Sequence, residues 1–319
     1  MAVFTSISEE DAREVARAHG LPPPASVEPI PAGSVNSNFF LVSGNRRWFL
    51  RIYEEQGPDG VAYEWALLDH LTARGLPVPR RVAGPPPGDL RVADRPVAVF
   101  EVIGGTMSCQ AGVTPARAAA VGAILAQTHR VTADFAVRRR GRFTLEDIAR
   151  RLESPEVRER PELAPAVAAA TEALEEVQTT WPPDLALGVV HGDLFRDNVH
   201  WEGDRIVALI DWESASDGAL VYDLAVTLLA WCWADDLDWD LARALIRGYT
   251  DVRPPSPEER AALRLACMAA ATRFTATRIT DYYLRDGIGE RVIKDYRRFL
   301  RRLEAIGALD ADTLARHLW

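Results

Sequence analysis

The stretch that decides the fold runs from residue 189 to residue 213 and reads VVHGDLFRDNVHWEGDRIVALIDWE. Short apolar runs typical of β-strands flank its polar centre, at 187–190, 199–201 and 206–210. Asp193 stands five residues before Asn198, and Asp211 stands thirteen residues after Asn198, at the end of the last apolar run. A turn at 202–204 joins the last two runs, so we expect the chain to return and bring Asp211 near Asn198.

This order of carboxylate, amide and carboxylate has the spacing of protein kinase active sites. Phosphoryl transfer depends on positioning and on neutralising the charge of the transferred group. Asp193 is suited to accept the proton of a hydroxyl group, whereas Asn198 and Asp211 offer hard oxygen ligands for Mg²⁺. The pattern therefore predicts a phosphotransferase with Asp193 as catalytic base and the other two residues on the metal. The alternative is a loop in which these residues only form turns.

Three more polar residues of the loop are candidates. We interpret His191 as a structural residue that braces the loop through side-chain hydrogen bonds, with a role as a base as the alternative. Arg196 and Asp197 lie inside the loop, where a contact with the substrate and a solvated turn are both open.

The composition is that of an acidic globular protein. The chain has 319 residues, 48% of them hydrophobic and 26% charged, and its net charge is −9. That charge disfavours nucleic acid and anionic membranes as partners, and no apolar run approaches the ~20 residues of a membrane span. The first residues do not resemble a secretory signal, so we expect a cytoplasmic protein. The three cysteines are widely spaced and indicate neither a zinc site nor disulfides.

The periodicity of apolar residues divides the chain into a β-rich first third and a mostly helical remainder. In the first third we expect helices at 8–18 and 62–74 and strands at 34–42, 47–53, 80–83 and 97–102. Further on we expect helices at 115–131, 162–177, 220–233, 237–249, 257–283 and 290–305. These patterns predict an α+β fold with two lobes: a nucleotide-binding lobe at 1–104 and a helical lobe at 105–319 that carries the catalytic loop and the acceptor site.

The first lobe offers a loop and an ion pair as candidate contacts for the nucleotide phosphates. The loop residues Ser34, Asn36 and Ser37 tolerate tight turns and could place backbone N–H groups over phosphates. Arg51 on the next strand stands where a protein kinase has lysine, and Glu64 can pair with it and fix its orientation. An exposed arginine and an exposed glutamate are the alternative. Only Lys294 among the 37 basic residues is a lysine, so arginine should make any phosphate contact.

A strand end near residue 101 is the candidate adenine site. Glu101 and Ile103 precede Gly104-Gly105, which fits a hinge between lobes whose backbone would hydrogen-bond the base. An ordinary edge strand is the alternative.

Three segments carry a family resemblance: HGDLFRDNV at 191–199, YDLAV at 222–226 and GLPVP at 75–79. In these segments the sequence resembles the aminoglycoside phosphotransferase and choline kinase superfamily, which has a protein-kinase-like fold, and within it the bacterial type II homoserine kinases. The resemblance implies ATP and Mg²⁺ as cofactors, Asp193 as base, and Asn198 and Asp211 as metal ligands. It also implies that Asp223 supports the catalytic loop; an early helix residue favoured by the helix dipole is the alternative.

The resemblance makes L-homoserine the best single acceptor. Trp212-Glu213 and Glu64 look more like the wider superfamily, so an aminoglycoside, choline, a thiosugar or a protein serine stays open as acceptor. For homoserine the site needs a cation for the carboxylate and an anion for the ammonium group. The candidate cations are Arg196, Arg273 and Arg278, and the candidate anions are Asp197, Glu213 and Asp281. A solvated helix face is the alternative for the residues of 272–283.

A hypothesis from another functional class is a nucleotide-binding regulator without turnover. The presence of all three chemical residues argues against it. The sequence leaves the oligomeric state open between a monomer and a homodimer.

Overall fold

The computed structural model describes residues 4–31, 35–285 and 294–319. The described chain forms two compact units, which are treated separately below. The first unit holds residues up to 105 together with 207–213, and the second holds 106–206, 214–285 and 294–319. The predicted lobes divided between residues 104 and 105, and the segment 207–213 was placed in the second lobe. In the structure this segment groups with the first unit.

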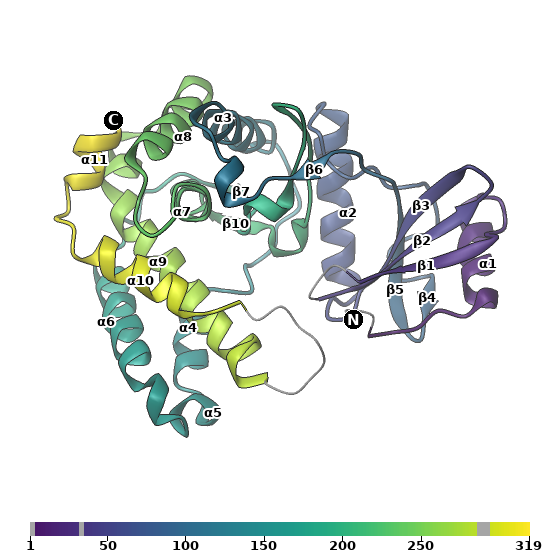
Figure 1. Ribbon diagram of the computed structural model, residues 1–319, viewed down its shortest axis with the longest axis horizontal. Helices are drawn as coiled ribbons and strands as arrows, with labels where there is room; N and C mark the ends of the chain where they lie inside the picture. The colour runs from purple at the N-terminus through teal and green to yellow at the C-terminus, as the bar shows by residue number, and fades with distance from the viewer. Residues whose placement is uncertain (1–3, 32–34, 286–293) are drawn as a thin grey trace. The chain divides into compact units, whose positions relative to one another are not determined.

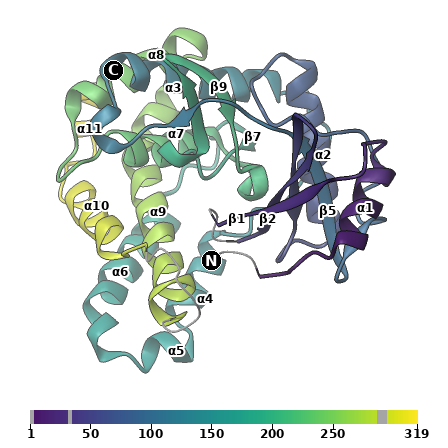
Figure 2. The same cartoon turned by 45° about the vertical axis from the view of Figure 1, so that its right-hand side comes forward.

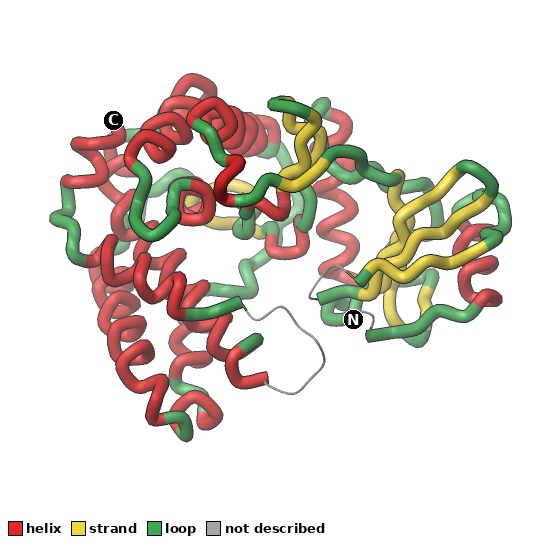
Figure 3. The backbone as a smooth tube through the Cα atoms, in the orientation of Figure 1, coloured by secondary structure: helices red, strands yellow, loops and turns green. Residues whose placement is uncertain are grey.

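The first unit is an antiparallel sheet of five strands with two helices (Figures 1 and 3). The strands are β1 (Ser26–Ile30), β2 (Ser37–Ser43), β3 (Arg46–Ile52), β4 (Arg91–Val92) and β5 (Arg95–Glu101), in the order β1-β2-β3-β5-β4. The helices are α1 (Glu9–Ala18) and α2 (Pro58–Ala73).

Alternating burial explains how this sheet forms a core. In β3 every second residue from Trp48 to Ile52 is buried, as expected for a strand with one covered face. Ala12 and Val15 of α1 pack against that face in one apolar cluster. The tight turn between β2 and β3 places Gly44 at φ 60°, a conformation that glycine adopts at no steric cost.

The second unit is mainly helical (Figure 2). Its helices are α3 (Pro115–Val131), α4 (Leu145–Leu152), α5 (Pro155–Arg158), α6 (Ala164–Thr180), α7 (Leu220–Trp231), α8 (Trp239–Val252), α9 (Pro257–Asp281), α10 (Arg297–Gly307) and α11 (Thr313–Leu318). The strands β6 (Thr106–Met107) and β8 (Val199–Glu202) pair with each other, and so do β7 (Leu187–Val190) and β10 (Ser216–Ala219). The strand β9 (Arg205–Leu209) follows β8 after a turn at Gly203, and its residues 207–209 group with the first unit.

The long helix α9 is the centre of the second unit. It packs against α4, α6, α7, α10 and α11, and nearly all of its side chains from Ala266 to Thr277 are buried. Ser256 and Glu259 form a capping box at its first turn, which satisfies backbone N–H groups that the helix itself leaves unpaired. Across the described residues, no helix has the length and apolar character needed to cross a membrane.

Most predicted elements are present, and the exceptions have physical causes. The predicted strand at 80–83 is wrong, because only a single bridge between Arg81 and Phe100 forms there. The sequence analysis missed β1, which contains Pro29 and lies at the sheet edge, where proline is tolerated. It also missed β10, whose Ser-Asp-Gly-Ala sequence has low β-propensity. Of the predicted helix at 290–305, residues 290–293 lie outside the described chain, and α10 begins at Arg297.

Two glycines allow α3 and α8 to approach closely. A Cβ atom on Gly122 of α3 would overlap the carbonyl oxygen of Leu245, and one on Gly248 of α8 would overlap the carbonyl oxygen of Ala119. Both obstacles are backbone atoms, so no side-chain rotation can relieve the clash. The contact between the two helices therefore requires glycine at both positions.

We expect Gly248→Ala to lower the free energy of unfolding by about 2 kcal/mol or more, because the added methyl group forces two helices apart. Urea unfolding measures this change. Gly307→Ala at the end of α10 is the matched control, since a Cβ there meets nothing within 4 Å. An equal effect of both substitutions would contradict this account of the helix contact.

Candidate active site

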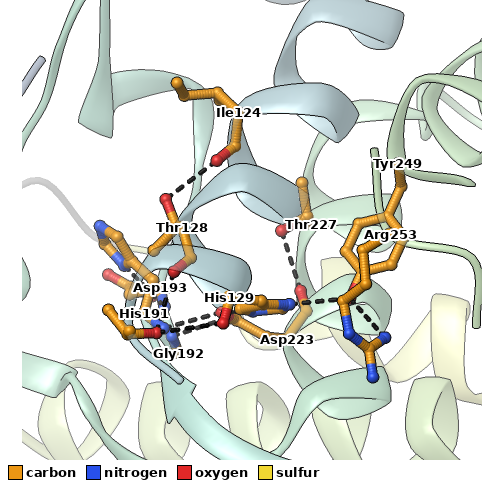
Figure 4. Close-up of polar contacts among 11 residues, drawn as sticks. Ile124, Thr128, His129, His191, Gly192, Asp193, Asp223, Thr227, Tyr249 and Arg253 are labelled. Atoms are coloured by element: carbon orange, nitrogen blue, oxygen red, sulfur yellow. Dashed lines mark hydrogen bonds and ion pairs between the residues drawn. The ribbon is translucent and has the colours of Figure 1, made fainter. Parts of the chain in front are cut away.

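The polar loop between β7 and β8 begins with two residues whose backbone is held by α7. The N–H groups of His191 and Gly192 donate to the two carboxylate oxygens of Asp223, at 2.7 and 2.8 Å (Figure 4). Gly192 has φ 73°, a left-handed conformation that favours glycine. Its carbonyl oxygen accepts a hydrogen bond from Arg273 of α9. The start of the loop is thus fixed from two helices.

Asp223 is fully buried and remains charged because donors surround it. His129 of α3 approaches it through Nε2 at 3.0 Å, in addition to the two backbone N–H groups. Burial by itself would raise the pKa of Asp223, but the hydrogen bond and charge of His129, the charge of His191 and the N–H of Gly192 outweigh it and lower the pKa below the ordinary value.

A chain of hydrogen bonds extends from Asp223 to the C-terminal end of α8. His129 Nδ1 lies 2.8 Å from the hydroxyl of Tyr249, and Arg253 donates to the same hydroxyl at 3.0 Å (Figure 4). Arg253 also binds Glu259 at 2.9 Å. Arginine can only donate, so the tyrosine hydroxyl accepts from Arg253 on one side and faces His129 Nδ1 on the other, while His129 Nε2 faces the carboxylate. The sequence analysis did not identify His129, Tyr249 or Arg253 as part of the site.

The middle of the loop is anchored by α7 and α9. The carbonyl oxygen of Leu194 accepts from Trp231 Nε1 at 2.9 Å, and Arg196 donates to the carbonyl oxygen of Ala230. The ring of Phe195 packs edge-on against Phe274, with centroids 4.9 Å apart. These contacts leave Asp193 half-buried between fixed neighbours.

Asp193 and Asn198 are in direct contact. The side-chain nitrogen of Asn198 donates to the carbonyl oxygen of Asp193 at 2.7 Å and lies 3.5 Å from its carboxylate. This orients the amide, so that its oxygen points away from Asp193 and is suited to bind a cation. The N–H of Asp193 donates to His191 Nδ1 at 3.3 Å, so His191 has the bracing contact expected of it.

Asp211 belongs to the first unit and adopts an unusual backbone conformation. Its φ of 66° is rare for a residue other than glycine, and such conformations cluster at functional sites. The turn is held on both sides: Leu209 donates its N–H to Pro77, and its carbonyl oxygen accepts from Trp212 Nε1 at 2.9 Å.

Arg51 forms a buried cluster with two carboxylates of the first unit. Its Nη1 lies 3.5 Å from Glu64 and 3.1 Å from Glu213. Burial opposes the charge of Arg51, but Glu213, Glu64 and Asp211 raise its pKa above the ordinary value. The predicted pair of Arg51 and Glu64 is present. Glu213, a candidate for the acceptor site, instead lies against Arg51 and Asn36.

The other candidate nucleotide residues are placed as follows. Ser34 lies outside the described residues. Asn36 uses its amide oxygen to accept from the N–H of Glu54, and Ser37 is buried, with its hydroxyl bound to Phe4, Thr5 and Glu54. Glu101 and Ile103 lie at and just after the end of β5, with partly accessible side chains.

The acceptor candidates of the second unit differ in what they already bind. Arg196 and Arg273 hold loop or helix carbonyls, and Asp281 pairs with Arg151 at 2.6 Å. Asp197 is exposed on the short 3₁₀ turn Arg196–Asn198. Arg278 is half-buried and donates to the carbonyl oxygen of Asp295 at 3.0 Å.

One sequence signal could have led to the missed residues. His129 is a polar side chain on the buried face of an otherwise apolar helix, which calls for a buried partner. Tyr249 has the same property on α8. A single sequence does not show which buried group each of them meets.

The chain is similar to known phosphotransferases. The sequence signature of the Phosphotransferase enzyme family matches residues 26–265. A homoserine kinase of Rhodospirillum rubrum is 35% identical over 287 residues, which cover 88% of each chain. A homoserine kinase of Methylobacterium radiotolerans is 37% identical over 311 residues, which cover 95% of each chain.

Among solved structures, an amicoumacin kinase in complex with AMP-PNP and Ca²⁺ superposes with a TM-score of 0.71. The two chains are 15% identical, and the match covers 91% of this chain and 92% of the other. At this identity the likeness concerns the fold alone. It confirms the predicted α+β, protein-kinase-like fold.

We expect Asp223→Asn to lower the free energy of unfolding by about 2 kcal/mol or more at pH 7, because it leaves buried donors without a charged acceptor. The folded-state pKa of Asp223 is lowered. Its contribution is therefore complete above the unfolded pKa of about 4 and is lost as pH falls further, towards the folded pKa. The difference between wild type and variant should shrink below about pH 4.

Urea unfolding at several pH values between 7 and 3 tests this dependence. Asp204→Asn is the control, because Asp204 is an exposed aspartate that pairs with Arg117. A stability difference for Asp223→Asn that stays constant over this range would show that the charge of Asp223 is not what stabilises the loop.

Proposed function

Because the chain belongs to the phosphotransferase enzyme family, we propose that it transfers the γ-phosphoryl group of ATP to the hydroxyl group of L-homoserine. The observation that carries the proposal is the loop in which Asp193 and Asn198 touch while Asp223 holds the backbone N–H groups before them. The similarity to homoserine kinases over most of the chain supports this choice of acceptor.

Asp193 acts as the catalytic base in this proposal. Its carboxylate orients the acceptor hydroxyl and takes its proton as the oxygen bonds to phosphorus. The contacts of its backbone with His191 and Asn198 fix the position of the side chain at little cost in entropy. Asp223 acts through the loop and does not itself meet the substrate.

Asn198 and Asp211 are the residues that would hold Mg²⁺. The amide of Asn198 is oriented with its oxygen away from Asp193, and Asp211 supplies an anionic carboxylate, so both residue types fit a hard cation. Over the described ranges, no group of three or more His, Cys, Asp or Glu side chains is arranged to bind a metal. Phosphate oxygens and water would complete the coordination, and the metal would neutralise charge on the β- and γ-phosphates.

The Arg51 cluster would receive the nucleotide phosphates. The charge of Arg51 is secured by its buried carboxylate partners, and its Nε has no hydrogen-bond partner among the described residues. Backbone N–H groups near Asn36 would add contacts to phosphate, and the backbone at Glu101 and Ile103 would bind adenine. The hydroxyl of Ser37 is already saturated, so it takes no part.

The charges near Asp193 favour a zwitterionic acceptor over a polycation. Tyr282, Asp193 and Asp197 together raise the pKa of Lys294 despite its burial. The pKa of Arg278 is lowered by burial and by Arg298, and the charge of Asp193 opposes this in part. Cations therefore lie close to the catalytic base. They suit an acceptor with a carboxylate and oppose an aminoglycoside, whose several ammonium groups need acidic surroundings. Asp197, which is exposed, is the candidate for the ammonium group of homoserine.

We expect Asp193→Asn to lower kcat on L-homoserine by ~100-fold or more, because the amide cannot accept the hydroxyl proton. A coupled assay of ADP release with Mg-ATP measures turnover on L-homoserine, choline, an aminoglycoside and methylthioribose. Turnover of the wild type on homoserine should fall within the range of roughly 1–100 s⁻¹ that is common for kinases.

Asp204→Asn is the control, because it makes the same change from carboxylate to amide at an exposed position and should leave kcat unchanged. Near-normal turnover of a correctly folded Asp193→Asn variant would remove Asp193 from the role of base. Wild-type turnover on another alcohol, with none on homoserine, would leave a phosphotransferase with a different acceptor.

A further inference from the structure

Arg302 of α10 is a buried cation without a polar partner. Its side chain belongs to a residue that is only 5% exposed, and its Nε is completely shielded. Within the described part of the chain this Nε has no hydrogen-bond partner. Its Cζ lies against aromatic rings, 4.4 Å from the ring centroid of Phe299 and 5.8 Å from that of Trp233. Burying an unpaired charge in this way costs free energy.

Other arginines add to this cost. Arg278 of α9 also lies over Phe299, with its Cζ 4.5 Å from the ring centroid. Burial, followed by repulsion from Arg278, Arg196 and Arg298, lowers the pKa of Arg302 to about 9. Burial and repulsion from Arg298 likewise lower the pKa of Arg278 to about 10. Arg302, Arg278 and Arg298 thus form a cluster of arginines. The negative charge around this cluster does not balance its positive charge.

The cluster lies beside the catalytic loop. The ring of Phe299 packs against Phe195, two residues after the proposed base, with centroids 5.8 Å apart. Asp193 is the first anion among the groups whose charges act on Arg278. Arg298 and Arg302 are four residues apart, so they share one face of α10, and Arg298 is exposed while Arg302 is buried. Positively charged side chains on this face of α10 therefore extend from the exposed Arg298 to the buried Arg302.

Two other arginines near the catalytic loop already donate hydrogen bonds to backbone carbonyl groups. Arg196 donates to the carbonyl oxygen of Ala230, and Arg273 donates to that of Gly192. Arg278 uses one nitrogen for the carbonyl oxygen of Asp295, which leaves the others of its five N–H donors for a ligand. Arg302 keeps its shielded Nε without a partner among the described residues. Arg302 and Arg278 are therefore the arginines against Phe299 that can still bind an anion.

We propose that Arg302 and Arg278, both placed against the ring of Phe299, bind the carboxylate of the acceptor while its hydroxyl group meets Asp193. The proposal rests on the proposed function and names the residues that select its substrate. The planar guanidinium group matches the geometry of a carboxylate, and the bound anion supplies the charge that the cluster lacks. An alcohol without a carboxylate leaves the buried charge uncompensated and binds weakly.

Arg302→Met tests this assignment, because methionine keeps the apolar bulk and removes the charge. The acceptors are L-homoserine and 3-aminopropan-1-ol, which is homoserine without its carboxylate. We expect KM for homoserine to rise by about 10-fold or more, as for the loss of a hydrogen bond between charged groups. kcat/KM for 3-aminopropan-1-ol should change little. The melting temperature should stay the same or rise, since an uncompensated charge is removed.

Arg301→Met is the matched control, since it removes the same charge from the neighbouring, exposed position of α10. It should leave both acceptors unaffected. Arg278→Gln should repeat the selective loss of homoserine. An equal loss of both acceptors in Arg302→Met, or a lower melting temperature with unchanged acceptor preference, would overturn the assignment and make Arg302 a structural residue.

Calorimetric titration of each protein with the two alcohols separates this proposal from the proposed function. If the wild type does not phosphorylate homoserine, the proposed function fails. The binding of homoserine to the two proteins then shows whether the carboxylate site exists. Wild-type binding of homoserine that is lost in Arg302→Met then supports a carboxylate site. Equal binding by both proteins, or binding by neither, overturns it.

Discussion

The carboxylate of Asp223 is the constraint on which the candidate site depends. It receives the backbone N–H groups of His191 and Gly192 and so determines where the loop can place Asp193. Such an anion can be buried only with several donors around it, and His129 supplies a further one from α3. Three segments far apart in the sequence must therefore be assembled before the loop has its geometry. The position of Asp193 and the folding of the second unit therefore both depend on the buried charge of Asp223.

The two units arrange their charges in opposite ways. Around Arg51 the carboxylates of Glu64, Glu213 and Asp211 outnumber the single cation, so a bare nucleotide would be repelled and a complex with a metal cation favoured. Near the catalytic loop the guanidinium groups are in excess, and they favour an anionic group on the acceptor. Each cluster is thus complementary to the charge of the ligand proposed for it, and unfavourable in its absence.

The parts of the site that are local in sequence could be predicted, and the parts that depend on packing could not. The spacing of Asp193 and Asn198 within one loop indicated a shared task, and the strand and helix pattern indicated the pair of Arg51 and Glu64. The partner of Glu213 was not predicted, because it depends on which compact unit the segment 207–213 joins. Arg302 was missed because an arginine-rich helix suggests a solvated face, and only the packing of α10 on α9 shows that one arginine is buried.

The glycine contact between α3 and α8 also limits how this sequence can evolve. His129 lies on α3 and Tyr249 lies on α8, next to Gly248, so the separation that the glycines allow also sets the hydrogen bond between these side chains. A larger residue at either glycine would move both partners and, through Asp223, the loop. These positions form a group in which a change at one restricts what the others can accept. Distant substitutions on the outer face of the helices escape that restriction, so divergence should concentrate there.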